Sequence, residues 1–185
     1  ALIIALILRG DKLVRRFAVA VTVADLALAS VIFFKYSQDR IGDGSGFRLV
    51  EQHTWIEPLN IQYLMAVDGL SAPMVLLTGI VMFTGVLISW NIEYRTKDFF
   101  MMFFLLVAGV FGVFVSLDLF FFFFFYELAV LPMYLLIGVW GSSSDFGSFL
   151  RPKEYGAMKL MLYLVAGSVL VWIAILAVYV QAPAE

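Results

Sequence analysis

Five long apolar stretches leave this chain few ways to fold. An α-helix needs about twenty residues to cross a hydrocarbon core ~30 Å thick. A stretch that meets lipid must be helical, because a lipid-exposed backbone has to satisfy its own hydrogen bonds. The sequence therefore predicts an all-α fold, a polytopic bundle of transmembrane helices. The five stretches cover residues 13–34, 70–90, 99–115, 119–140 and 155–180.

The composition agrees with a membrane protein and excludes several functions. Charged residues make up 14% of the chain, whereas about 25% is usual in a soluble domain. The absence of cysteine excludes disulfides, thiolate iron–sulfur ligation and a cysteine nucleophile. The one histidine, His53, falls between spans, which excludes a bis-histidine haem inside the bilayer. The glycine-rich segment 42–46 lacks the ending of a phosphate-binding loop. We expect no cofactor in this chain and no nucleic-acid partner.

The segments before and after the first complete span, residues 1–12 and 35–69, show further features of the chain. Residues 1–8 are apolar but too short to span, and a basic cluster follows them; a signal peptide would carry that cluster in front, so we favour the end of a truncated helix. The β-prone segments 47–56 and 61–67 flank a turn-like cluster and predict a hairpin on the membrane surface. The predicted regions are two N-terminal helices at 1–34, an outward loop at 35–69, four helices at 70–180 and an outward tail at 181–185.

The distribution of lysine and arginine predicts the orientation, because cytoplasmic loops carry an excess of basic residues. Eight basic residues fall on one side of the alternating spans and three, Lys35, Arg40 and Arg48, on the other. The loops at 9–12, 91–98 and 141–154 are therefore expected in the cytoplasm or its equivalent, with the loop at 35–69 outside. We expect a bacterial plasma membrane, with an organellar inner or thylakoid membrane as the alternatives.

Glu127 is the strongest candidate for a functional residue. It lies in an otherwise apolar span, nine residues after Asp118. At 1.5 Å per residue its carboxyl lies ~13 Å inside the membrane, near the middle. A carboxylate there costs on the order of 2.5 kcal/mol or more, and such residues usually line a proton or ion path. We therefore predict that Glu127 takes part in proton movement.

Two further residues are candidates for the same path. Pro132, five residues after Glu127, removes the helical hydrogen bond to the Leu128 carbonyl and predicts a kink beside the carboxyl. The alternative is a kink that serves packing alone. Lys159 lies ~7.5 Å into the last span. Its ammonium either faces the side of the bundle that holds Glu127, where it would favour the ionised carboxylate, or snorkels to the interface.

Two other acidic residues are weak candidates. Asp25 falls in the middle of its span, but Thr22 lies one turn before it and offers a local hydrogen-bond partner. Asp68 precedes Ser71 and Pro73, a pattern typical of a helix start, so we interpret Asp68 as structural. Two patches of small residues, 108–112 and 166–168, predict close helix contacts.

Several of these segments together resemble a known family, the antiporter-like membrane subunits of respiratory complex I. The match covers nearly everything from Trp55 to Tyr179. Its closest type is the chain M, or chain 4, subunit of proton-pumping NADH:quinone oxidoreductase. The start of the family's third helix is similar to Trp55-Ile56 with Val67-Asp-Gly-Leu-Ser71 and Leu76-Leu-Thr78. Its fifth helix is similar to Asp118-Leu-Phe with Tyr126-Glu-Leu and Leu131-Pro-Met-Tyr-Leu-Leu-Ile-Gly-Val-Trp-Gly141. Its sixth helix is similar to Ala157-Met-Lys-Leu-Met-Leu-Tyr163 with Ala166-Gly-Ser-Val-Leu170.

The resemblance implies an antiporter-like fold of about fourteen helices, of which this chain would hold the first five to six. It implies that Glu127 is the buried acid of the first half-channel, and that Lys159 belongs to the same hydrophilic axis. The sequence departs from the family at Tyr126, where tryptophan is usual. It also stops before the seventh, broken helix, whose lysine pairs with the glutamate in the family. We therefore expect this chain to be part of a longer subunit.

The function expected from this resemblance is proton translocation by a membrane subunit of NADH:quinone oxidoreductase, with Glu127 and Lys159 coupling remote electron transfer to proton movement. The expected partners are the lipid bilayer and other membrane subunits, including neighbouring antiporter-like chains. Flavin and iron–sulfur clusters are expected in partner subunits, and no direct quinone binding is expected here. One alternative is the large subunit of a multisubunit sodium/proton antiporter. The other is a structural scaffold subunit, which predicts that Glu127 tolerates a neutral replacement.

Overall fold

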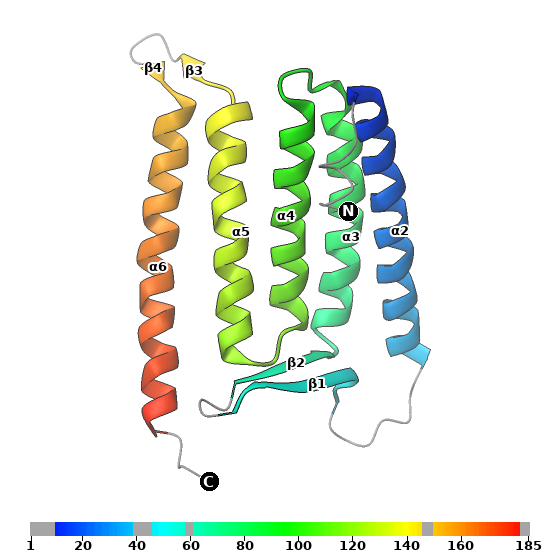
Figure 1. Ribbon diagram of the computed structural model, residues 1–185, viewed down its shortest axis with the longest axis vertical. Helices are drawn as coiled ribbons and strands as arrows, with labels where there is room; N and C mark the ends of the chain where they lie inside the picture. Colours follow the sequence, from blue (N-terminus) through cyan, green and yellow to red (C-terminus); the bar gives the residue numbers. More distant parts are fainter. Residues whose placement is uncertain (1–9, 39–45, 58–60, 146–149, 182–185) are drawn as a thin grey trace.

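The described residues form five long helices, and all five are long and apolar enough to cross a membrane. The computed structural model describes residues 10–38, 46–57, 61–145 and 150–181 (Figure 1). The predicted bundle of transmembrane helices is therefore confirmed, while the predicted helix at 1–8 lies outside the described residues. The helices are α2 at Asp11–Gln38, α3 at Ser71–Ile88, α4 at Thr96–Val115, α5 at Leu119–Trp140 and α6 at Lys153–Gln181, with a short 3-10 helix, η2, at Ser89–Asn91 after α3.

Consecutive helices pack side by side, so that α2 and α6 stand at opposite edges of the bundle (Figure 1). The hydrophobic core lies where the first half of α2 meets the end of α3 and the beginning of α4. Phe100 at its centre is completely buried. The core residues are Val14, Ala18, Met82, Val86, Phe99, Phe100, Phe104 and Val107.

An antiparallel hairpin closes one end of the bundle, below α3, α4 and α5 (Figure 1). It consists of β1 at Arg48–Ile56 and β2 at Ile61–Val67, the two segments that the sequence marks as β-prone. The backbone of β2 is joined to the α4–α5 turn, because the Leu117 N–H donates to the Leu64 carbonyl at 3.0 Å. A second small pair, β3 at Ser144–Asp145 with β4 at Leu150–Arg151, lies at the opposite end.

Aspartate side chains fix the first turns of two helices. The carboxylate of Asp118 accepts hydrogen bonds from the Phe120 and Phe121 N–H groups at 2.8 and 3.2 Å, which satisfies donors that a helix start leaves unpaired. Its second oxygen accepts from the Gln62 N–H in β2 at 3.2 Å. Asp118 therefore ties the start of α5 to the hairpin.

The start of α3 uses a reciprocal pair. The Asp68 carboxylate accepts from the Ser71 N–H at 2.6 Å, and the Ser71 hydroxyl accepts from the Asp68 N–H at 2.8 Å. This is the arrangement of a capping box. The hydrogen bond from the Ser71 backbone holds the pKa of Asp68 below its usual value. Asp68 has the structural role that its sequence context indicates.

Two glycines let α4 and α5 approach closely near Glu127. A Cβ atom added at Gly109 would lie 3.0 Å from the Cβ of Ala129 and from the Phe125 carbonyl oxygen. One added at Gly112 would collide with the ring of Phe125. The small-residue patch at 108–112 therefore does make a close helix contact. At Gly167, by contrast, an added Cβ meets no atom of the described residues within 4 Å.

Candidate functional site

Glu127 lies in a hollow between α5 and α6, at the middle of α5. The hollow has a volume of about 350 Å³. From Asp118 to Glu127 the helix rises ~13 Å, and from Glu127 to Trp140 it rises ~20 Å. The carboxyl is therefore far from both ends of the span. The hollow is lined by Phe123, Glu127, Ser168, Val169 and Trp172.

One oxygen of the Glu127 carboxyl, Oε1, is buried and has no hydrogen-bond partner within the described part of the chain. A buried polar atom without a partner costs about 1–3 kcal/mol, and more if it is charged. Water or another hydrogen-bond donor that enters the hollow would satisfy this oxygen. The Glu127 carboxyl therefore offers an acceptor atom that no described residue uses.

Ser168 of α6 forms the polar wall of this hollow opposite Glu127. Its side chain is 4% exposed, and its hydroxyl donates to the Val165 carbonyl at 3.0 Å. The lone pairs of the hydroxyl oxygen can still accept a hydrogen bond from a neutral acid or from water. The ring of Phe123 packs on Trp172, with centroids 5.1 Å apart, and forms the apolar part of the lining.

Sequence reasoning included Ser168 only in a packing patch and did not single it out for the site. A serine in an apolar helix draws no special notice. Only the contact of α5 with α6 shows that this serine shares a hollow with Glu127.

Lys159 does not line the hollow that contains Glu127. It lies nine residues before Ser168, which corresponds to ~13 Å along α6. Its side chain is exposed, and its ammonium stands 5.9 Å from the centroid of the Tyr163 ring. The structure therefore places Glu127 and Lys159 at different depths, and their joint action stays a prediction.

Pro132 is fully buried inside α5, which runs without interruption from Leu119 to Trp140. Since proline has no N–H, the carbonyl of Leu128, the residue next to Glu127, loses its helical donor. The predicted kink and its role in a path both stay predictions.

Asp25 is half-buried in α2. The Thr22 hydroxyl donates to the Val19 carbonyl at 3.0 Å. Within the described residues it forms no hydrogen bond with Asp25, so Thr22 is not the local partner that the sequence offers for Asp25.

The described residues contain no group of three or more His, Asp or Glu side chains that could hold a metal ion. The chemistry available at this hollow is therefore that of one carboxyl, one hydroxyl and whatever enters between them. These groups can hold and transfer a proton.

Comparison with known proteins gives relatives across nearly the whole chain, although no protein-family model matches it. A relative from Trichodesmium erythraeum, NAD(P)H-quinone oxidoreductase chain 4 2, is 34% identical over 168 residues, which is 91% of this chain and 28% of that protein. Relatives called chain 4 3 from Picosynechococcus and chain 4-2 from Synechocystis are 36% and 34% identical, each over 95% of this chain and 30% of theirs. The chain thus spans about 30% of the length of these curated relatives.

A solved structure has the same fold. It is the membrane-bound sulfane sulfur reductase, an archaeal respiratory membrane complex, and it matches with a TM-score of 0.68 at 20% identity. The match covers 91% of this chain and 31% of that one. At this identity the likeness shows the fold alone.

The five long apolar helices of the described residues define a polytopic integral membrane protein. The relatives define its family more closely. Curated homologues named NAD(P)H-quinone oxidoreductase chain 4, an antiporter-like subunit of complex I, cover more than nine-tenths of this chain. The resemblance drawn from the sequence is confirmed.

Proposed function

We propose that this chain moves protons as part of the membrane arm of an NAD(P)H-quinone oxidoreductase, and that Glu127 is the group that carries the proton. One observation supports this proposal above the others: a carboxyl oxygen is buried without a partner, at mid-depth, beside a hollow large enough for water. A scaffold would gain nothing from such a group, because neutral side chains pack equally well at lower cost.

The physical basis of the proposed coupling is the charge of Glu127. A positive group that approaches to ~5 Å favours the ionised carboxylate by about 3 kcal/mol at an effective dielectric constant near 20. When that group withdraws, this stabilisation of the carboxylate is lost. A partner charge that moves in step with remote electron transfer would therefore drive uptake and release at Glu127. Lys159 and Pro132 are the other residues that we assign to this path.

Water is the proposed carrier between Glu127 and its surroundings. A water molecule occupies about 30 Å³ of liquid volume and needs polar partners. The hollow of about 350 Å³ has room for several, with the Glu127 carboxyl and the Ser168 hydroxyl as partners. We propose that Ser168 holds a water molecule against the carboxyl.

The remaining parts of the proposal concern the complex. The electron-carrying flavin and iron–sulfur clusters would lie in partner subunits, because this chain has no cysteine and one histidine. The membrane subunits of the complex are the proposed partners, and α6 offers them a largely exposed apolar surface. A bacterial plasma membrane or a thylakoid membrane is the proposed location, with the hairpin end facing outward.

The test replaces Glu127 by glutamine in the whole complex. The variant should keep electron transfer from NAD(P)H or its equivalent to quinone while losing proton translocation, measured as quenching of a pH-sensitive dye in sealed vesicles. Glu93→Gln is the matched control, since Glu93 is exposed in the α3–α4 connection and its loss should leave pumping unchanged. Full proton translocation in Glu127→Gln would refute the proposal and favour the scaffold.

A further inference from the structure

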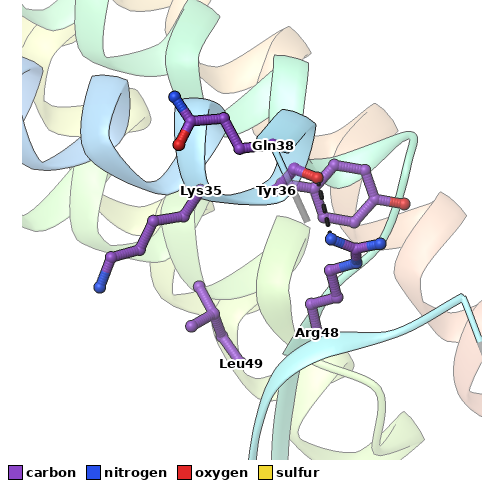
Figure 2. Close-up of a pocket in the computed structure, with 5 residues that line it drawn as sticks. All are labelled: Lys35, Tyr36, Gln38, Arg48 and Leu49. Carbon is purple, nitrogen blue, oxygen red and sulfur yellow. Dashed lines mark hydrogen bonds between the residues drawn. The ribbon is translucent and has the colours of Figure 1, made fainter. Parts of the chain in front are cut away.

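A basic hollow lies where α2 ends and β1 begins, on the opposite edge of the bundle from the α5–α6 contact that holds Glu127. The proposed proton path does not use it. It has a volume of about 460 Å³ (Figure 2). Because the hairpin closes this end of the bundle, the hollow lies at the level where the helices leave the membrane (Figure 1). It is lined by Lys35, Tyr36 and Gln38 from α2 and by Arg48 and Leu49 from β1.

Arg48 is held in place on one side of this hollow. Its guanidinium donates to the Tyr36 carbonyl at 3.1 Å (Figure 2) and lies 5.0 Å from the centroid of the Tyr36 ring. The two contacts join the start of β1 to the last turns of α2. They also place a permanent positive charge beside the carbonyl end of that helix, where a cation is stabilising.

Lys35 supplies a second positive charge on the other side of the hollow. Figure 2 shows its side chain extending away from Arg48, with Leu49 between the two. Lys35 is exposed, and within the described residues it makes no hydrogen bond or ion pair. Its four-carbon stem gives the ammonium freedom to turn toward a ligand.

From Lys35 toward the middle of α2, the same face of the helix is apolar and open. Leu28 and Val31 lie seven and four residues before Lys35, so all three share one face of the helix. Leu28 is 61% exposed and Val31 49% exposed. Since α2 stands at the edge of the bundle (Figure 1), this face has basic groups at the membrane surface and an apolar strip running into the membrane.

We propose that this hollow binds an anionic membrane lipid, with the phosphate of the headgroup between Lys35 and Arg48 and an acyl chain along Leu28 and Val31. A free phosphate would use the two cations but not the apolar strip. Each basic residue near an anionic lipid surface strengthens binding about fivefold. The segment from 35 to 48 keeps a net positive charge, because it contains Lys35, Arg40 and Arg48 against Asp39 and Asp43.

The experiment uses the intact complex in lipid nanodiscs doped with phosphatidylglycerol that carries a photoactivated diazirine on its acyl chain. Labelled residues are located by mass spectrometry, and labelling of residues 28–35 is the readout. A phosphatidylcholine with the same diazirine is the lipid control. Lys35→Gln should lower phosphatidylglycerol labelling about fivefold, and Lys35→Arg should restore it.

Lys12→Gln is the matched control variant, because it removes the same charge from an exposed position at the other end of α2. It should leave labelling of residues 28–35 unchanged. Equal labelling by the two lipids, or unchanged labelling in Lys35→Gln, would overturn the proposal. Loss of labelling on addition of millimolar glycerol 3-phosphate would also overturn it, since a site for the free headgroup phosphate would then explain the two cations. Persistence of labelling in its presence supports the lipid.

Discussion

Replacing Gly112 by alanine should strain the contact between α4 and α5 beside Glu127. The added Cβ atom overlaps the Phe125 ring at Cγ, its innermost atom. Because Cγ is bonded directly to the Cβ of Phe125, turning the ring about its own axis does not relieve the overlap. Either the whole side chain changes rotamer or the two helices move apart, and Glu127 lies only two residues further along α5.

The size of the effect follows from two opposing contributions. Overpacking of a well-packed contact costs about 1–3 kcal/mol. Replacing glycine by alanine within a helix recovers about 1 kcal/mol. Gly138→Ala in α5 is the matched control, since its added Cβ would lie 3.7 Å from the Cβ of Ala157, an ordinary contact. The helix contribution is common to both variants, so their difference of about 1–3 kcal/mol measures the overlap alone.

Reversible unfolding of the subunit in mixed detergent micelles gives the two free energies of unfolding. Proton translocation by the whole complex gives a second readout, which should fall in Gly112→Ala because α5 is displaced, and stay unchanged in Gly138→Ala. A Gly112→Ala variant at least as stable as Gly138→Ala would refute the reasoning about this contact.

Two further predictions concern the helix starts. Asp118→Ala should destabilise the chain by about 1 kcal/mol or more and expose the hairpin to proteolysis, whereas Asp118→Asn keeps an acceptor and should protect it; equal cleavage of both would contradict the role of Asp118. Because the pKa of Asp68 is lowered in the folded chain from 3.8, its stabilising contribution is complete above that value and is lost as the pH falls through the folded pKa. Unfolding measured from pH 6 down to pH 2 should therefore show a loss of stability that is smaller in Asp68→Asn, and an identical loss in both would count against the cap.

The long elements could be predicted because they follow from the length of apolar stretches. The span at 119–140 coincides with α5, since Asp118 and Gly141 mark both its ends in the sequence. Three other spans are longer in the structure by a few residues of interfacial character, as in α2, which starts at Asp11 and ends at Gln38. The span predicted at 70–90 is shorter as an α-helix, because α3 ends at Ile88 and the 3-10 helix η2 follows it. The hairpin was visible in its two β-prone segments for the same local reason.

The faces of the helices could not be predicted. A soluble helix shows its buried side by an apolar stripe, but these helices are apolar all round, so the pattern does not tell lipid from neighbour. For this reason the sequence could not separate Gly112, which contacts Phe125, from Gly167, which meets open space. It likewise left both orientations of Lys159 open and did not reveal that Ser168 shares a hollow with Glu127.

The hydrogen bond between Asp118 and the hairpin fixes both the position at which α5 begins and its rotation about its own axis. Glu127 is the ninth residue after Asp118, and at this spacing its side chain lines the hollow between α5 and α6. Each residue turns an α-helix by ~100°. One residue added between Asp118 and Glu127 would therefore rotate the acid around the helix by that angle, while moving it only ~1.5 Å further from Asp118 along the axis. The number of residues in this segment thus determines the direction in which the Glu127 side chain points around the helix far more tightly than its depth in the bilayer.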